Sequence, residues 1–293
     1  MHKIIVITGP TAVGKTKLSI ELAKKYDGEI INADAVQVYK GLDIGSAKVT
    51  EEEKEGVPHH LLDFKEVTEE YTIYHYQKDC REKIKEIQSR NKTPILVGGT
   101  GLYIKAALYD YKLSEEKSTN TYDNLTNEEL YEELKKLDKD IIIDKDNRRR
   151  LIRAINYYKE NNESINKNKT NKLLYNVIFI GLTTDRQVLY DKINKRVDEM
   201  ISQGLLEEVK SFYDKGIKSK SLLNAIGYRE LYNYLDGNCT KEEAIEKIKQ
   251  NSRHYAKRQY TFFNHQLPVV WFETDYNNFN NTIEKVASYI DSN

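Results

Sequence analysis

The chain has 293 residues, 39% of them hydrophobic and 31% charged, and its 46 Lys and Arg residues balance its 46 Asp and Glu residues. This length suits two domains or one core with an insertion, and the zero net charge excludes a global field that attracts nucleic acid. The two distant cysteines, Cys80 and Cys239, exclude a disulfide framework and a cysteine zinc site. No apolar run approaches the roughly 18 residues of a membrane span, and no signal peptide is visible. We therefore expect a soluble, cytoplasmic protein.

Short apolar runs alternate with amphipathic segments in the first part of the chain. Apolar residues at three- and four-residue steps between Tyr71 and Ser89 predict a helix, and the glycines of 37–45 exclude a long element there. In chain order we predict a strand at 3–8, a helix to about 25, a strand at 29–32, a short strand or loop at 58–63, the helix at 71–89, a buried strand at 94–98 and a helix to 108.

The pattern changes between about residues 111 and 147, which are charged and carry one short amphipathic helix with Leu130, Leu134 and Leu137. We predict a small all-helical insertion domain there. Beyond it we predict a helix at 148–158 that returns to the core, a surface loop at 161–172, a strand at 177–182, a helix from an N-cap at Asp185 to about Gly204, a helix at 241–263 and a strand at 269–272.

Strands separated by helices predict an α/β fold with a doubly wound parallel sheet. We assign its core to residues 1–110 and 148–293, with the insertion domain at 111–147 between them.

Residues 9–16 read GPTAVGKT and lie between the first predicted strand and helix, so they match the phosphate-loop motif G-x-x-x-x-G-K-[ST] in its expected context. The glycines let backbone N–H groups turn inward, and the following helix adds the positive end of its dipole. The Lys15 ammonium suits an outer phosphate, and the Thr16 hydroxyl suits Mg²⁺. The alternative is a glycine turn that binds nothing. The predicted phosphate contacts are Gly9, Thr11, Ala12, Val13, Gly14, Lys15 and Thr16.

Two polar residues are predicted to face this loop. A P-loop kinase or ATPase needs an acid after a second buried strand to hold Mg²⁺. The strand at 94–98 instead leads into Gly99 and Thr100, and the nearest carboxylate is Asp34 after the strand at 29–32. The carboxyl ends of parallel strands meet at the edge where ligands bind, so we expect both to line the site. The alternatives are a turn residue at Asp34 and a helix start at Thr100.

Basic residues form clusters that are candidates for RNA contact. A solvated face is the alternative for each cluster, but interleaved Tyr255 and Tyr260 offer stacking surfaces that favour RNA. The clusters are Arg148, Arg149, Arg150 and Arg153 on one helix, Arg253, Lys257 and Arg258 on another, and Arg196 beside the apolar stripe of the helix after 177–182. The adjacent His59 and His60 have no acid or cysteine at ligand spacing, so we interpret them as structural.

Eight stretches resemble the tRNA dimethylallyltransferase family and follow the family's order over nearly the whole chain. The most specific are DAVQVYKGLDIG within the second stretch and VGGTGLY within the fourth. The stretches are 9–16 (GPTAVGKT), 32–48 (NADAVQVYKGLDIGSAK), 58–63 (PHHLLD), 96–103 (LVGGTGLY), 150–155 (RLIRAI), 196–205 (RVDEMISQGL), 225–230 (AIGYRE) and 255–259 (YAKRQ).

This resemblance implies that the loop binds the diphosphate of dimethylallyl diphosphate rather than ATP, with Mg²⁺ at Thr16. It implies transfer of the dimethylallyl group to N6 of adenosine 37 in tRNAs that read codons beginning with U, by a monomer that needs no membrane. Asp34 would be the general base, Thr100 would position the adenine or the base, and Arg196 would stabilise the leaving diphosphate. The insertion would grip the anticodon stem-loop. The implied tRNA contacts are Asp34, Ala35, Val36, Gln37, Thr100, Arg149, Arg150, Arg153, Arg229, Lys257 and Arg258.

The chain departs from the family pattern at two positions. Ala35 stands where Ser is usual, which removes a hydroxyl near the adenine, and Asn264 stands where Arg is usual, which removes a phosphate contact. The insertion is short, and the zinc finger of eukaryotic relatives is absent, so we expect a bacterial-type enzyme. Three other functions stay open on the residues alone: prenylation of free adenine nucleotides, a P-loop kinase or NTPase, and a non-catalytic RNA-binding protein.

Overall fold

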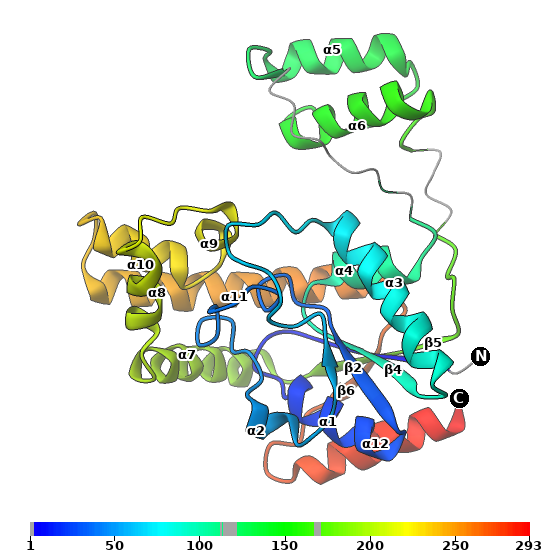
Figure 1. The fold of residues 1–293 in the computed structure, drawn as a ribbon, viewed down its shortest axis with the longest axis vertical. Helices are drawn as coiled ribbons and strands as arrows, with labels where there is room; N and C mark the ends of the chain where they lie inside the picture. Colours follow the sequence, from blue (N-terminus) through cyan, green and yellow to red (C-terminus); the bar gives the residue numbers. More distant parts are fainter. Residues whose placement is uncertain (1–2, 112, 114–121, 167–170) are drawn as a thin grey trace. The chain divides into compact units, whose positions relative to one another are not determined.

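The computed structural model describes residues 3–111, 113, 122–166 and 171–293 (Figure 1). The chain divides into two compact units, one formed by Met1–Ala107 with Tyr175–Asn293 and the other by Leu108–Leu174. None of the helices in the described ranges has the length and apolar character needed to cross a bilayer.

The larger unit is built on a six-stranded sheet in the order β3-β2-β4-β1-β5-β6, in which every neighbouring pair is parallel. Because β1 pairs with β4 on one side and β5 on the other, the loop after β1 emerges beside the loop after β4. This confirms the predicted parallel α/β sheet. The strands are β1 (Ile4–Thr8), β2 (Gly28–Asn32), β3 (His59–His60), β4 (Thr93–Val97), β5 (Val177–Thr183) and β6 (Val270–Glu273).

Alternating strand residues place two layers of helices on the sheet. Ile5 and Ile7 pack into one core with Leu18 of α1 and Val286 of α12, and these two helices lie together on that face (Figure 1). α3 contacts β2 and β4 on the other face. The helices that flank the sheet are α1 (Lys15–Lys25), α2 (Glu51–Lys54), α3 (Ile73–Ser89), α4 (Gly101–Leu108), α7 (Arg186–Ser202) and α12 (Phe279–Ser292).

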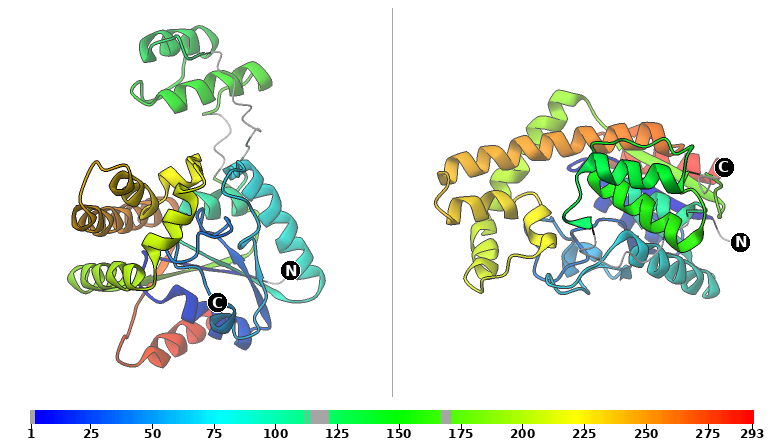
Figure 2. Two further views of the ribbon diagram at one scale, coloured as in Figure 1. Left: turned by 60° about the vertical axis from the view of Figure 1, so that its left-hand side comes forward. Right: turned by 90° about the horizontal axis from the view of Figure 1, so that it is seen from above.

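Four further helices connect β5 to β6 after α7. α11, orange in Figure 2, runs beside both α7 and α10. The sequence predicted α7, its N-cap at Asp185 and the long α11, but not the short helices between them. Asp185 Oδ1 accepts from the N–H groups of Gln187 and Val188 at 2.8 and 3.2 Å, as an N-cap does. These helices are α8 (Leu205–Tyr213), α9 (Lys220–Asn224), α10 (Tyr228–Leu235) and α11 (Lys241–Gln266).

Among its described residues the smaller unit contains the helices α5 (Asn127–Leu137) and α6 (Arg148–Asn161). Leu130 and Leu134 of α5 are fully buried against Leu151 and Ile155 of α6. The chain enters and leaves the unit through an antiparallel bridge between Tyr109 and Leu173.

The predicted end of the insertion at residue 147 is therefore wrong. α6 belongs to the smaller unit, because its apolar stripe packs on α5 and its first residue binds the same unit. The Arg148 guanidinium donates to the carbonyl groups of Tyr122 and Leu125, both at 2.5 Å. The smaller unit extends to Leu174, and part of the loop predicted at 161–172 lies outside the described residues.

His59 and His60 are structural, as predicted. They form the edge strand β3, and His60 Nε2 lies 2.6 Å from Glu29 Oε2, which also accepts from Arg90 at 2.7 Å. Burial opposes the charge of Glu29, but these two hydrogen bonds outweigh it and hold its pKa below the ordinary value.

Candidate active site

The phosphate loop follows β1 at the carboxyl edge of the sheet, as the motif requires. Its backbone has positive φ at Gly9 (131°), Ala12 (68°) and Gly14 (94°). Gly14 suits this position, because residues with a side chain rarely adopt its φ and a Cβ there would also lie 2.7 Å from the Phe279 ring. Gly14 is the N-cap of α1, and no side chain among the described residues caps this helix. Its first N–H groups therefore suit an anion.

Lys15 and Arg196 bring two positive charges to this loop. Lys15 Nζ donates to the carbonyls of Gly9 and Pro10 at 3.1 and 2.6 Å, and Arg196 Nη1 donates to Thr11 Oγ1 at 3.3 Å. Burial, and then the neighbouring Arg196 charge, lowers the pKa of Lys15 to about 7, although the Asp34 carboxylate opposes this shift. Burial also lowers the pKa of Arg196. The structure therefore joins the three predicted residues Lys15, Arg196 and Asp34 in one electrostatic field.

Asp34 and Thr100 meet because β2 and β4 are neighbours. The Thr100 N–H donates to the Ala33 carbonyl at 3.1 Å, and the Thr100 hydroxyl accepts from the Ala35 N–H at 3.0 Å. Asp34 Oδ1 accepts from the Val36 N–H at 2.9 Å, which fixes the orientation of the carboxylate. Asp34 thus makes the turn contact that the alternative predicted, and it does so while lying beside the phosphate loop.

Gln259 of α11 ties the two loops together, and the sequence did not single it out. Its side chain is buried; Oε1 accepts from the Thr11 N–H at 3.2 Å, and Nε2 donates to the Gly99 carbonyl at 3.1 Å. Tyr255, one turn earlier, lies near the same carbonyl, and burial beside Asp34 raises its pKa well above the ordinary value. The sequence signal for Gln259 was its place in the stretch YAKRQ, whereas Tyr255 was predicted as a stacking surface for RNA.

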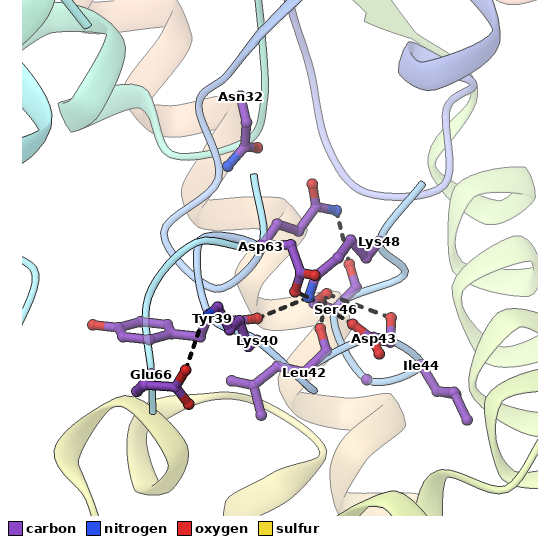
Figure 3. Close-up of polar contacts among 12 residues, drawn as sticks. Asn32, Tyr39, Lys40, Leu42, Asp43, Ile44, Ser46, Lys48, Asp63 and Glu66 are labelled. Atoms are coloured by element: carbon purple, nitrogen blue, oxygen red, sulfur yellow. Dashed lines mark hydrogen bonds and ion pairs between the residues drawn. The ribbon is translucent and has the colours of Figure 1, made fainter. Parts of the chain in front are cut away.

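The loop after Asp34 is held by internal contacts (Figure 3). Lys48 lies between Asp43 and Asp63 and also donates to the Tyr39 carbonyl at 2.7 Å; its side chain is only 6% exposed. Gln37 Nε2 donates to the Ser46 and Ala47 carbonyls at 3.0 and 3.2 Å. The amide nitrogen of Gln37, a predicted tRNA contact, thus helps to shape its own loop.

A carboxylate from α8 completes this loop. Glu208 accepts from the N–H groups of Asp43, Ile44 and Gly45 at 3.0, 2.7 and 3.1 Å, and from the Tyr228 hydroxyl. A Cβ on Gly45 would lie 2.6 Å from the Tyr228 ring, so a larger residue there would have to displace this ring.

The basic residues predicted to bind RNA divide between the two units. In the larger unit Arg229, Lys257 and Arg258 are exposed, and Arg258 lies over the Tyr255 ring at 5.7 Å. In the smaller unit Arg149 and Arg150 are exposed on α6, whereas Arg153 on the same helix is half-buried.

Arg253 and Asn264, both considered in the sequence analysis, form hydrogen bonds within the fold. Arg253 does not join the exposed pair on α11, because its guanidinium donates to Asn194 Oδ1 of α7. Asn264, where the family usually has Arg, accepts from Trp271 Nε1 at 2.9 Å and so links α11 to β6.

The family model described as IPP transferase matches residues 37–266 of this sequence. The chain belongs to the IPP transferase family. This member is 50% identical to a tRNA dimethylallyltransferase of Anoxybacillus flavithermus over 99% of its own length and 96% of the relative's. The prediction of a tRNA dimethylallyltransferase is confirmed, and the kinase and free-nucleotide alternatives receive no support.

Solved structures agree with this membership. The full-length tRNA isopentenylpyrophosphate transferase from Bacillus halodurans is 42% identical, with a TM-score of 0.78 over 100% of this chain and 96% of that chain. A eukaryotic dimethylallyltransferase acting on tRNA is 29% identical, with a TM-score of 0.89 over 100% of this IPP transferase and 79% of that chain. The predicted P-loop fold is thereby confirmed.

Lys48 provides a test of what holds the loop after Asp34. We expect Lys48→Met to lower the free energy of unfolding by about 1–3 kcal/mol, because the Tyr39 carbonyl and two carboxylates lose a buried donor. Lys40→Met is the matched control, since the Lys40–Glu66 pair lies on the same loop but Lys40 is 51% exposed. Urea denaturation of both variants measures the difference. Equal stability of the two variants would mean that Lys48 does not secure the loop.

Proposed function

We propose that this IPP transferase moves the dimethylallyl group of dimethylallyl diphosphate to N6 of adenosine 37 in tRNAs that read codons beginning with U, working as a monomer in the cytoplasm. The observation that carries the proposal is the convergence at one sheet edge of the phosphate loop, its two cations and the Asp34 carboxylate. A diphosphate needs the loop and its cations, and a nucleophile that must lose a proton needs the carboxylate. The reaction therefore needs all of these groups in one place.

The phosphate loop serves the diphosphate half of the reaction. Lys15 and Arg196 repel each other, and a diphosphate placed between them relieves this repulsion while it accepts from the N–H groups of the first turn of α1. Charge grows on the diphosphate as its bond to C1 of the allyl group breaks. Cations held in fixed positions stabilise this developing charge most effectively, because they do not have to reorient as the bond breaks.

Asp34 serves the adenine half. The exocyclic N6 amine is a weak nucleophile; it forms a bond to C1 as the C1–O bond breaks, and Asp34 accepts the proton that N6 loses. Thr100 acts through the backbone, since its hydroxyl binds the Ala35 N–H next to this carboxylate. Ala35 supplies no hydroxyl of its own.

The donor set fits a Mg²⁺ ion that arrives with the diphosphate. No group of three or more His, Cys, Asp or Glu residues in the described ranges could hold a metal, while the exposed Thr16 hydroxyl lies on the first turn of α1. Mg²⁺ favours such a site, with one or two protein oxygens, phosphate oxygens and water. Thr16 would hold the ion, which neutralises diphosphate charge when bound.

Exposed basic residues in both units supply the contacts to tRNA phosphates. Those of the larger unit are Arg229, Lys257 and Arg258, and those of the smaller unit are Arg149 and Arg150, with Arg153 on the same helix. Val36 and Gln37, beside Asp34, are the proposed contacts nearest the adenine.

Mass analysis of nucleosides tests this function directly. Unmodified tRNA incubated with the protein, Mg²⁺ and dimethylallyl diphosphate should gain a dimethylallyl group on adenosine 37. Absence of that product with turnover of ATP would indicate an ordinary nucleotide site, and equal modification of free AMP would indicate the free-nucleotide activity.

Asp34→Asn isolates the charge of the proposed base. The Asn oxygen can still accept from the Val36 N–H, so the turn survives, and we expect kcat to fall about 10²–10⁴-fold while tRNA affinity is kept. Single-turnover kinetics and filter binding measure the two quantities. If tRNA affinity falls and kcat does not, Asp34 recognises adenine and another group is the base.

The lowered pKa of Lys15 predicts proton uptake on diphosphate binding. Above about pH 7 Lys15 is mostly neutral, and the bound anion stabilises its charged form, so affinity falls as the pH rises through this value. At about pH 8.5 we expect the wild-type protein to take up about one proton more on binding inorganic diphosphate than Lys15→Arg, which keeps its charge. Calorimetry in buffers of different ionisation enthalpy measures this difference, in which the proton exchange of the ligand itself cancels. Equal uptake by both proteins would contradict the assignment to Lys15.

Arg258→Ala tests the RNA face of α11. We expect weaker tRNA binding with a slope of log affinity against log salt that is shallower by about 1, and unchanged diphosphate binding. Lys285→Ala is the control, because it removes the same charge from a different helix, α12, which packs with α1. An unchanged slope for Arg258→Ala would remove this residue from the interface.

A further inference from the structure

The segment after β6 lies against the phosphate loop, and it falls outside the residues that match the family model, which end at 266. Thr274 continues the pairing with β5, its N–H donating to the Thr183 carbonyl at 2.9 Å. Its buried hydroxyl donates to the Val13 carbonyl at 3.0 Å, and the Tyr276 hydroxyl donates to the Ala12 carbonyl at 3.4 Å. Two consecutive carbonyl groups of the phosphate loop are therefore bound by this segment.

These contacts set the direction of the loop's N–H groups. In a planar trans peptide the carbonyl and the N–H point in opposite directions, so turning the Val13 carbonyl toward Thr274 turns the Gly14 N–H the other way. Gly14 has a φ of 94° and can adopt many conformations, so it cannot by itself prevent this peptide from rotating. The Thr274 hydroxyl supplies the missing restraint.

The segment is itself rigidly anchored. The Asp275 carboxylate accepts from the N–H groups of Asn277 and Asn278 and from the Asn281 side chain, at 2.9 to 3.0 Å. The Phe279 ring lies against Gly14, and Lys192 lies 3.7 Å above the Tyr276 ring. Because these contacts hold the segment in place, its hydrogen bonds can in turn hold the phosphate loop in place.

We propose that Thr274, assisted by Tyr276, is a positioning residue that holds the Val13–Gly14 peptide with its N–H toward the diphosphate. The inference rests on the proposed role of the loop as the diphosphate site. It assigns to the carboxyl-terminal segment a part in substrate affinity that is separate from tRNA binding.

Thr274→Val keeps the shape of the side chain and removes the hydroxyl. We expect the dissociation constant for inorganic diphosphate and the KM for dimethylallyl diphosphate to rise about 3- to 10-fold, the worth of one hydrogen bond, with the KM for tRNA unchanged. Thr274→Ser should restore the wild-type values. Tyr26→Phe is the matched control, because the Tyr26 hydroxyl binds the Ala287 carbonyl of α12 at 3.1 Å without touching the loop, and it should bind diphosphate normally.

The outcomes separate the two proposals. If the wild-type protein binds neither inorganic diphosphate nor dimethylallyl diphosphate, the function proposed for the loop fails. If the wild type binds and Thr274→Val binds equally well, or if Tyr26→Phe loses as much affinity, the positioning role is overturned. Should Thr274→Val not fold, Tyr276→Phe decides: we expect about a 2-fold loss of diphosphate affinity, and none would overturn the role.

Discussion

The parallel pairing of β2, β4 and β1 is the constraint on which the rest of the site depends. Parallel strands end at the same edge, so the pairing of these three strands by itself places the turns after them side by side. Gly98 makes the approach possible, since a Cβ there would lie 2.2 Å from the Ala33 carbonyl oxygen. Backbone packing at this point brings Asp34, Thr100 and the phosphate loop within one site.

The candidate site places two basic groups close together. Burial, and then the Arg196 charge, lowers the pKa of Lys15, and the Lys15 ammonium donates to the loop's own carbonyls. Under the proposed function, the charge that grows on the leaving diphosphate would offset the repulsion between these two side chains, so the same pair would serve both affinity and catalysis.

Local sequence signals predicted the strands, the phosphate loop and the position of Asp34 and Thr100 at the carboxyl edge of the sheet, because each depends on short-range patterns and on the geometry of a parallel sheet. The end of the insertion was mispredicted because the apolar stripe of α6 does not reveal which partner it covers. Gln259 and Thr274 were missed for a related reason: each acts on a backbone group more than 150 residues away. The clusters of basic residues wrongly suggested RNA contact for Arg148 and Arg253, because their guanidinium groups bind within the fold.

The three N–H groups of Asp43, Ile44 and Gly45 form a concave nest of the kind that binds phosphate in other proteins. Here Glu208 fills it from inside the chain, and the Tyr228 ring closes it over Gly45. An arrangement of N–H groups that could bind an anion is thus satisfied within the chain. The DIG stretch at 43–45 therefore serves to hold the loop in shape through Glu208.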